Sequence, residues 1–320
     1  MSVRWRRLWG TGAISIALCI TSATLLPPPA QAIAPASAPP STTEVTSLGT
    51  TTPSPPPLLS LFSLRPKFPL REPGQPGLVV AHRGASTTAP ENTLPAIAAA
   101  ATAHADYVEI DIRMSKDGVP VVIHDSTVDR TTDGTGPVAS LTLAEMQRLD
   151  AGSWFSPEYA GTRIPTLEQV LALTADTHLS IVIEYKGRWT PAAISTTVDQ
   201  IAAADLRGHV ITQSFNEQTV ENISTVAPNL FVGWLTDRID SSIVHTAQRI
   251  GADAVNPETT TPRGLAQAHD AKLRVFVWTK DADRDWEDLT AIGVDGIMTN
   301  TPRALTEWIE QRSPEGGLSK

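Results

Sequence analysis

The chain has 320 residues and a formal net charge of −9, with 25 Lys and Arg residues against 34 Asp and Glu residues. A protein that binds duplex nucleic acid needs a basic face, so this charge argues against a nucleic-acid partner. Cys19 is the only cysteine, which excludes an intramolecular disulfide. The stability of the protein must therefore come from a hydrophobic core or from a bound ion.

Residues 1–32 have the features of a secretory signal peptide. Three arginines within the first seven residues precede an apolar run from Thr11 to Leu26, and Ala30-Gln31-Ala32 offers a small-x-small cleavage site. The run is closed by prolines and is shorter than the roughly 20 residues that span a bilayer. We expect cleavage after residue 32, no stable transmembrane span in the mature chain, and a secreted or cell-envelope location. An uncleaved anchor is the alternative, and both the Sec and the twin-arginine routes remain open.

Residues 33–77 are rich in Pro, Ser and Thr and contain few large apolar side chains. Such a composition cannot bury enough surface to offset its ordering entropy, so it predicts a disordered linker. The linker could tether the following domain to the cell wall or envelope. The apolar run 58–64 could instead be a short docking segment. At the other end of the chain, residues 313–320 are predicted to form a flexible tail.

Residues 78–312 alternate short apolar runs, typical of buried strands, with amphipathic helical stretches. Val, Ile and Leu runs separated by helices indicate a parallel sheet covered on both faces. Eight such units predict an α/β fold of the closed (β/α)₈ TIM barrel type rather than an open sheet. The predicted strands are 78–81, 107–114, 179–185, 209–212, 230–235, 252–255, 273–278 and 295–298, with 120–123 beside the second. The predicted helices are 92–104, 167–174, 191–203, 217–226, 242–250, 262–269, 283–292 and 302–310.

Several carboxylates occur near the carboxyl ends of the predicted strands, where the active sites of such barrels lie. Glu109 and Asp111 lie two residues apart on one strand, so they point to the same face about 6.6 Å apart. Glu184 falls on an adjoining strand. Three carboxylates in one place require protonation, separation or a cation, and an all-oxygen ligand set suits Ca²⁺ or Mg²⁺. The alternative is that one carboxylate faces outward, between the barrel and its helices.

Two histidines and two cationic side chains belong to the same rim of the predicted barrel. His82 and His124 are candidates for general acid and base, because an imidazole titrates near neutral pH. A lone histidine at a strand end is more often a packing or capping residue, but two on one rim give a sharper signal. Arg83 and Lys186 suit an anionic group. These residues together predict a metal-assisted hydrolase of an anionic substrate.

Ordered sequence blocks across residues 78–309 resemble the glycerophosphodiester phosphodiesterase family, in particular its secreted bacterial members. The first block, from His82 to Thr93, resembles the HRG…PENT opening of that family. Further similar blocks are Glu109-Ile110-Asp111, Ser115-Lys116-Asp117-Gly118, Val121 to Asp125, Asp129 to Thr132, Gly152 to Phe155, Ile164 to Leu167, Glu184-Tyr185-Lys186 and Gly293 to Asn300. Several blocks in order over a whole domain are far more specific than any single tripeptide.

The resemblance implies a TIM barrel with a short insertion after the second strand, here residues 125–165. It also implies a role for each matching residue. Glu109, Asp111 and Glu184 would bind one divalent cation, either Ca²⁺ or Mg²⁺; His82 and His124 would be the catalytic acid–base pair; Arg83, Lys186 and Trp278 would bind the phosphate and the rest of the substrate; Glu91 would orient His82 or Arg83; and Asn92 would cap the first helix.

The reaction that the resemblance implies is hydrolysis of a glycerophosphodiester, a small molecule, to an alcohol and glycerol 3-phosphate. In one proposed route the glycerol 2-hydroxyl attacks phosphorus and water then opens the cyclic phosphate. We favour His124 as the base and His82 as the acid of that route. After Trp278-Thr279 the family often continues with an aliphatic residue and Asn, whereas Lys280-Asp281 follow here. This departure leaves the contact to the alcohol end of the substrate uncertain.

Two other functions fit the same barrel. A lysophospholipase D or a sphingomyelinase-D-like enzyme would need an apolar slot beside the ion, which Trp154, Phe155 and Tyr159 could provide. A non-catalytic module that binds glycerol-phosphate polymers would not need the histidines or the carboxylates. Because none of these residues is missing, the sequence favours an enzyme.

Overall fold

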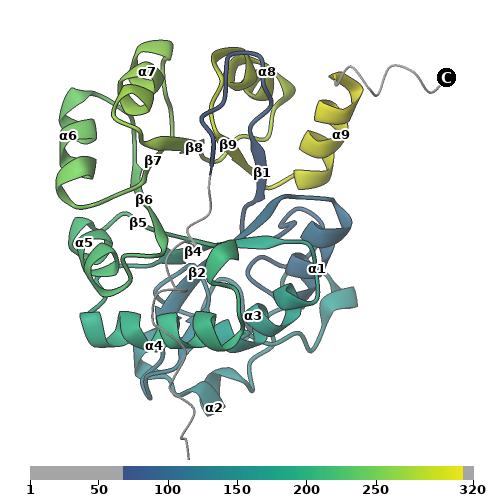
Figure 1. Cartoon of the computed structure of the whole chain (residues 1–320). Helices are drawn as coiled ribbons and strands as arrows, with labels where there is room; N and C mark the ends of the chain where they lie inside the picture. The colour runs from purple at the N-terminus through teal and green to yellow at the C-terminus, as the bar shows by residue number, and fades with distance from the viewer. Residues whose placement is uncertain (1–67, 313–320) are drawn as a thin grey trace, which may run out of the picture. The chain divides into compact units, whose positions relative to one another are not determined.

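The computed structural model describes residues 68–312, and within this range eight parallel strands close into a barrel surrounded by helices (Figure 1). The strands follow the order β1-β9-β8-β7-β6-β5-β4-β2, and β1 pairs with both β9 and β2, which closes the ring. The predicted TIM barrel is therefore confirmed. The predicted signal peptide, residues 33–67 of the predicted linker and the predicted tail lie outside the described residues. The parallel strands are β1 (Leu78–Ala81), β2 (Tyr107–Met114), β4 (Ser180–Tyr185), β5 (Val210–Ser214), β6 (Phe231–Thr236), β7 (Ala254–Pro257), β8 (Arg274–Val277) and β9 (Gly296–Thr299).

Helices follow the parallel strands and form the outer layer of the barrel (Figure 1). Their starts are set by local chemistry, because threonine hydroxyls accept backbone N–H groups at the N-termini of α1, α3, α4 and α7. Among the described residues, no helix is both long enough and apolar enough to cross a membrane. The helices are α1 (Leu94–Thr102), α3 (Leu167–Ala175), α4 (Pro191–Ala203), α5 (Glu217–Val226), α6 (Ser241–Arg249), α7 (Pro262–Asp270), α8 (Asp283–Ile292) and α9 (Pro302–Arg312).

The first helix begins two residues later than predicted. Its N-cap is Thr93, whose hydroxyl accepts the N–H of Ala96. Asn92 has a φ of 57°, which is incompatible with a helical residue. The prediction that Asn92 caps this helix is therefore wrong, and its amide is free for another partner.

The interior of the barrel has an apolar floor below the carboxyl ends of its strands. One core cluster lies inside the strands and contains Val80, Tyr107, Val182, Ile211, Phe231, Ala254, Phe276 and Met298. A larger cluster fills the space between the strands and the helices and includes Val108, Ile110 and Ile112 of β2. Because side chains alternate along a strand, β2 places Tyr107, Glu109 and Asp111 on the opposite, inner face.

The insertion after the second strand forms a small subdomain with its own core. It is preceded by β3 (Pro120–Val122), which pairs antiparallel with β2. A separate apolar cluster joins β3 to the short helices η2 (Val138–Ser140) and α2 (Leu143–Met146). The insertion also contains the short helix η3 (Pro157–Tyr159). Another short helix, η4 (Arg207–His209), lies outside the insertion and precedes β5. The insertion holds His124 and Asp125 beside the end of β2.

The described part of the predicted linker packs on the barrel. The Phe68 ring lies 4.9 Å from the ring of Phe231, and the Phe68 carbonyl accepts the Nε–H of Arg274 at 2.6 Å. The Arg71 N–H donates to Asp295 Oδ1 at 3.0 Å. The predicted linker boundary at residue 77 is therefore wrong. Its proline-rich composition predicted disorder, but Phe68 supplies an anchor on the barrel floor.

We predict that Phe68→Ala lowers the free energy of unfolding by about 2 kcal/mol, because the half-buried ring fills the floor of the barrel. Urea denaturation of the mature protein measures this loss. Phe215→Ala is the matched control, since that ring is 46% exposed and its loss should cost less than about 1 kcal/mol. Equal losses in the two variants would show that the segment contributes nothing specific.

Candidate active site

The loop after β1 brings candidate catalytic side chains together through an unusual backbone. Arg83 has a φ of 58° and Gly84 a φ of 85°, so the chain turns sharply after His82. A Cβ at position 84 would lie 2.7 Å from Ala96, which explains the glycine. Asn92 also adopts a positive φ. Non-glycine residues in this region are strained, and such strain is commonly found at functional sites.

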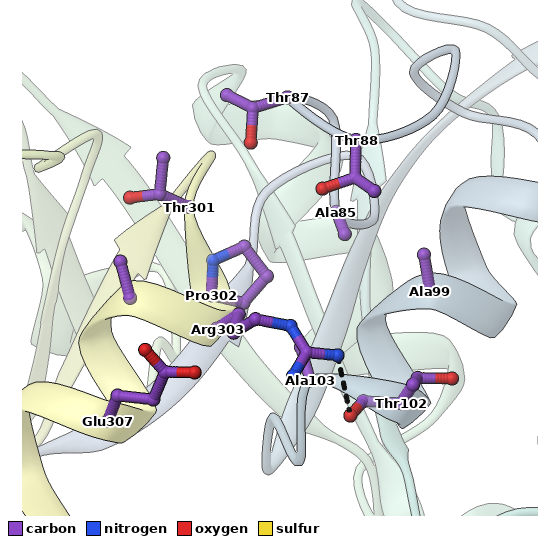
Figure 2. Close-up of a pocket in the computed structure, with 11 residues that line it drawn as sticks. Ala85, Thr87, Thr88, Ala99, Thr102, Ala103, Thr301, Pro302, Arg303 and Glu307 are labelled. Carbon is purple, nitrogen blue, oxygen red and sulfur yellow. Dashed lines mark hydrogen bonds between the residues drawn. The ribbon is translucent and has the colours of Figure 1, made fainter.

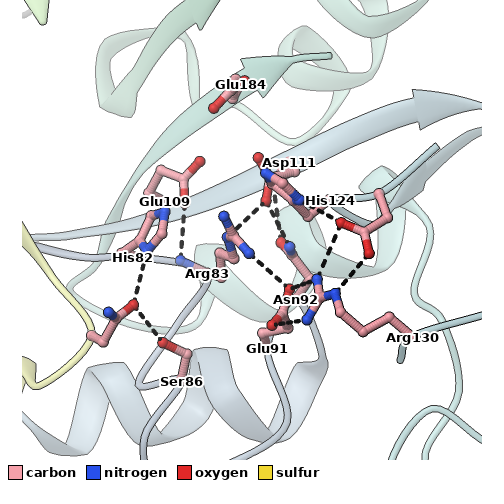
Figure 3. Close-up of polar contacts among 12 residues, drawn as sticks. His82, Arg83, Ser86, Glu91, Asn92, Glu109, Asp111, His124, Arg130 and Glu184 are labelled. Carbon is pink, nitrogen blue, oxygen red and sulfur yellow. Dashed lines mark hydrogen bonds and ion pairs between the residues drawn. The ribbon is translucent and has the colours of Figure 1, made fainter. Parts of the chain in front are cut away.

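Three carboxylates converge at the mouth of the barrel (Figure 3). Asp111 on β2 pairs in register with Glu184 on β4, and Glu109 lies one inward position earlier. One oxygen from each carboxylate lies within 4.8 Å of the others, and all three residues are buried. The prediction that these side chains share one site is thus confirmed by their positions, and none of them faces outward.

Neighbouring groups contact all three of these carboxylates. Asn92 binds Asp111 twice, because its Nδ2 donates to Asp111 Oδ2 at 2.8 Å and its Oδ1 accepts the Asp111 N–H at 3.1 Å. The Arg83 N–H donates to Glu109 Oε2 at 2.9 Å. On the other side, Lys186 Nζ lies 2.7 Å from Glu184 Oε1 and 3.4 Å from Asp111 Oδ1. The positive-φ residues Arg83 and Asn92 therefore place the carboxylates directly.

The carboxylate cluster carries an electrostatic conflict. Burial and the charges of Asp111 and Glu184 raise the pKa of Glu109 well above its usual range. Burial and the charge of Asp111 raise the pKa of Glu184 to about 7, although Lys186 opposes this shift. Burial also acts to raise the pKa of Asp111, but Lys186 and Arg83 outweigh it and lower that pKa. Without further positive charge, the cluster holds a proton near neutral pH.

The cluster fits a hard divalent cation. Glu109 Oε1 is buried and has no hydrogen-bond partner among the described residues. Asp111 Oδ1 is likewise buried, and its neighbour Lys186 Nζ lies beyond ordinary hydrogen-bond length. Buried carboxylate oxygens without partners are costly unless they coordinate a metal or are protonated. All-oxygen ligands of this kind suit Ca²⁺ or Mg²⁺.

His82 is held by a chain of hydrogen bonds from the end of β9. Its Nδ1 lies 2.8 Å from Asn300 Oδ1, while Asn300 Nδ2 donates to Asp281 Oδ2 at 2.7 Å. Because a carboxylate only accepts, the amide must turn its Oδ1 toward the imidazole. His82 Nδ1 therefore carries the proton, and Nε2 keeps a lone pair in the neutral ring. Burial, assisted by the charge of Arg83, lowers the pKa of His82 to about 4.

His124 is held by a separate network that ends at Arg83. His124 Nδ1 donates to Asp125 Oδ1 at 2.7 Å, and Arg130 Nε donates to Asp125 Oδ2 at 2.7 Å. Arg130 also binds both carboxylate oxygens of Glu91, which in turn accepts from Arg83 Nη1 at 3.0 Å (Figure 3). Burial lowers the pKa of His124, while Asp111 and Asp125 oppose the shift. The partner of Glu91 is therefore Arg83, one of the two predicted.

A cavity of about 180 Å³ lies above these groups. One wall is apolar and contains the rings of Phe215 and Trp278, whose centroids are 5.4 Å apart. The Trp278 indole N–H donates to the Asn256 carbonyl, so its ring offers contact rather than a hydrogen bond. The other residues that line the cavity are His82, Arg83, Glu109, His124, Glu184, Lys186, Gln213, Leu235, Thr279 and Met298.

A second hollow, of about 380 Å³, lies between α1 and α9 (Figure 2). Alanine and threonine side chains form most of its walls, and its charged side chains are Arg303 and Glu307. Arg303 Nη2 donates to the Thr102 carbonyl at 3.4 Å. This hollow contains no histidine and no carboxylate cluster, so it lacks the groups for acid–base chemistry.

Sequence reasoning missed the residues that hold the two imidazoles. Asn300 and Asp281 support His82, and Arg130 supports His124 through Asp125. Arg130 belongs to a sequence block noted above, but no pattern in the sequence shows that it bridges Glu91 and Asp125. Lys280 and Asp281, the departure from the family pattern, do not line the cavity. Asp281 instead accepts a hydrogen bond from Asn300, the residue that binds His82 Nδ1.

We predict that Glu184 makes the metal-free protein lose thermal stability as the pH rises from about 5 to 7.5. Burial raises the pKa of Glu184 from about 4.5 in an exposed chain to about 7 in the folded protein. Between these two values the folded state holds a proton that the unfolded state has released, so this contribution to stability is lost as the pH rises and is gone above 7. The lowered pKa values of His82 and His124 act in the opposite direction, so calorimetry should compare the wild type with Glu184→Gln. The Tm of the wild type should fall by a few degrees relative to that of Glu184→Gln, and Ca²⁺ or Mg²⁺ should restore it. A Tm difference that stays constant over this range would contradict the conflict among the carboxylates.

Known proteins are similar to this chain in both sequence and fold. The sequence profile of the glycerophosphoryl diester phosphodiesterase family matches residues 82–304. The glycerophosphodiester phosphodiesterase of Caldanaerobacter subterraneus subsp. tengcongensis is 37% identical over 238 residues, which are 73% of this chain and 98% of that protein. A glycerophosphodiester phosphodiesterase of Bacillus subtilis is 34% identical over 70% of this chain and 84% of that protein.

Solved structures agree with these sequence relatives. A phosphodiesterase of Oleispira antarctica, in complex with the product sn-glycerol-3-phosphate, superposes with a TM-score of 0.70 and 27% identity, over 73% of this chain and 97% of that one. A glycerophosphodiester phosphodiesterase of Agrobacterium tumefaciens gives a TM-score of 0.64 and 29% identity, over 72% and 99% of the two chains. With the profile covering most of the barrel, the chain belongs to the glycerophosphoryl diester phosphodiesterase family.

Proposed function

We propose that the protein hydrolyses glycerophosphodiesters to an alcohol and glycerol 3-phosphate, with one divalent cation, Ca²⁺ or Mg²⁺, at Glu109, Asp111 and Glu184. The observation that carries this proposal is the cluster of these three buried carboxylates, two of which, Glu109 and Glu184, line one small cavity together with His82 and His124. Family membership and the names of the relatives support the same substrate class.

The three carboxylates would bind the metal ion, and the side chains of Arg83 and Lys186 would bind the phosphate. When bound there, the divalent cation supplies positive charge that relieves the carboxylate repulsion and polarises a phosphate oxygen. Arg83 and Lys186 line the same cavity and offer N–H donors to the remaining phosphate oxygens. Glu91 and Asp111 hold the Arg83 guanidinium, with Arg83 Nε 3.4 Å from Asp111 Oδ2. The orientation of the Arg83 guanidinium is therefore fixed before a substrate binds.

The two imidazoles differ in their partners, and this difference assigns their roles. His82 faces a neutral amide and has a pKa near 4, so at neutral pH its Nε2 is free to accept a proton. Burial lowers the pKa of His124 as well, but the carboxylates of Asp125 and Asp111 oppose this shift, so His124 is more readily protonated than His82. We therefore assign His82 as the base that deprotonates the attacking hydroxyl and His124 as the acid that protonates the leaving alcohol. This reverses the assignment that the sequence favoured.

The shape of the site supports a small, soluble substrate. Its apolar wall consists of Phe215, Leu235, Trp278 and Met298, a short surface suited to a glycerol backbone. Trp154, Phe155 and Tyr159 pack against one another in the insertion and do not line this cavity. The apolar slot that a lysophospholipase D would take from these aromatics is thus absent from the described part of the site.

We place this reaction outside the cytoplasmic membrane. The support is the pattern of residues 1–32, which fits a cleaved signal peptide, and the proline-rich stretch that follows, which suits a tether to the envelope. N-terminal sequencing of the exported protein would then begin at Ile33.

The proposed reaction is tested by incubating the mature protein with glycerophosphocholine, glycerophosphoethanolamine and a lysophospholipid, with Ca²⁺, Mg²⁺ or a chelator. We expect glycerol 3-phosphate from the first two substrates and none of it after chelation. His124→Ala should lower kcat by about 10²–10⁴-fold, because general acid–base catalysis is typically worth that much. His245→Ala, an exposed histidine of α6, is the control. Turnover that resists the chelator, or that survives in His124→Ala, would refute the mechanism.

We predict that Asn300→Ala lowers kcat roughly tenfold with little change in KM, because one hydrogen bond that selects the His82 tautomer is lost. Ser86→Ala should have a smaller effect, since Ser86 reaches His82 only through Asn300 Oδ1. Nitrogen-15 NMR of the His82 ring separates positioning from damage to the fold. An unchanged tautomer with unchanged kcat in Asn300→Ala would show that the contact is incidental.

A further inference from the structure

A basic cavity adjoins the catalytic cavity beside β4. Its volume is about 400 Å³, and the two cavities share Lys186 as a lining residue. Arg113 and Arg188 line it as well, and none of the side chains that line it is acidic. Three cationic groups thus surround one hollow in a chain whose formal net charge is −9. This concentration of positive charge calls for an anionic occupant.

The two arginines keep most of their donors available. Arg113 Nε donates to the His124 carbonyl at 2.9 Å, while its terminal nitrogens have no hydrogen-bond partner among the described residues. Arg188 is exposed and forms no ion pair within residues 68–312. The carboxylates whose charges act on Arg113 are Asp111, Glu184 and Asp125, which are already engaged in the catalytic site. Lys186 is paired with Glu184, so the positive charge that remains available to the cavity comes from Arg188 and from the terminal nitrogens of Arg113.

The rest of the cavity wall suits a phosphorylated polyol. Helix α4 is 13 residues long and begins beside the cavity, where Thr190 and Ala193 line it, so the positive end of its dipole adds to the cationic groups. Ser126 contributes a hydroxyl, and Met114 and Ala139 give apolar contact surface. The Trp189 indole N–H already donates to the Lys186 carbonyl. Guanidinium groups with such surroundings match the fork geometry of phosphate oxygens.

We propose that this cavity is a second anion subsite, which binds a phosphate carried by the alcohol portion of the substrate. Lys186 stands between the two cavities, so a diester held at Lys186 and Arg83 extends its alcohol past Lys186 toward Arg113 and Arg188. The preferred substrates are then glycerophosphodiesters with a second phosphate on the alcohol. The substrate preference that we infer depends on the proposed hydrolysis, whereas binding of a second phosphate in this cavity does not.

The test compares glycerophosphoinositol with glycerophosphoinositol 4-phosphate, which differ only by one phosphate. We expect the wild-type protein, with its divalent ion at low salt, to show a higher kcat/KM for the second substrate. Arg188→Gln should lower the ratio of the two kcat/KM values roughly fivefold, since a charge-assisted contact at a partly exposed site is modest in strength. Added salt should lower the ratio as well. Arg263→Gln, an exposed arginine of α7, removes the same charge elsewhere and should leave the ratio as in the wild type.

Two outcomes overturn the subsite. One is a wild-type ratio near one; the other is a ratio that Arg188→Gln does not change. If neither compound is hydrolysed, the proposed reaction has failed, and binding decides the inference by itself. Calorimetric titration with inositol 1,4-bisphosphate and inositol 1-phosphate, without metal, should then show tighter binding of the bisphosphate that depends on Arg188. A gain of affinity that Arg188→Gln retains would refute the subsite.

Discussion

Mutual repulsion among three buried carboxylates determines how the mouth of this barrel is built. Glu109, Asp111 and Glu184 have been brought within 4.8 Å of one another by adjacent strands. Each pair of such charges repels by roughly 3 kcal/mol at an effective dielectric constant of about 20. Lys186 and Arg83 offset only part of this, as the raised pKa values of Glu109 and Glu184 show. The divalent cation that we propose for this site would have the charge and the ligand preference to offset the remaining repulsion.

The surrounding loops serve to hold polar groups that the strands alone could not fix. Arg83 and Asn92 occupy positive-φ positions on the loop after β1, and each contacts a carboxylate of the cluster. Arg130, which belongs to the insertion, binds both Asp125 and Glu91. Asp125 holds His124 and Glu91 holds Arg83, so a single guanidinium supports both residues. On the other side, Asp281 and Asn300 set the tautomer of His82. The two imidazoles thus have different electrostatic partners within one site.

The sequence was sufficient for the barrel and for the cluster of three carboxylates because both depend on the periodicity and the order of the strands. Alternation along β2 placed Glu109 and Asp111 on one face, and the parallel order of the strands brought Glu184 beside them. The supports of the histidines depend on contacts between distant segments, such as Asn300 with His82 and Arg130 with Glu91, which leave no periodic signal. Composition misled at Phe68, where a single aromatic ring anchors a proline-rich stretch. The prediction that Asn92 caps the first helix was wrong because the side-chain amide of Asn92 binds the carboxylate of Asp111 on β2.

Crystallography with a divalent ion tests the central claim most directly. Crystals of the mature protein grown with Mn²⁺ in place of the natural ion would locate it by anomalous diffraction. The account predicts one ion bonded to oxygens of Glu109, Asp111 and Glu184, with His82 and His124 facing the same cavity. An ion bound elsewhere in an active protein, with these three carboxylates protonated or paired only with Lys186 and Arg83, would contradict it.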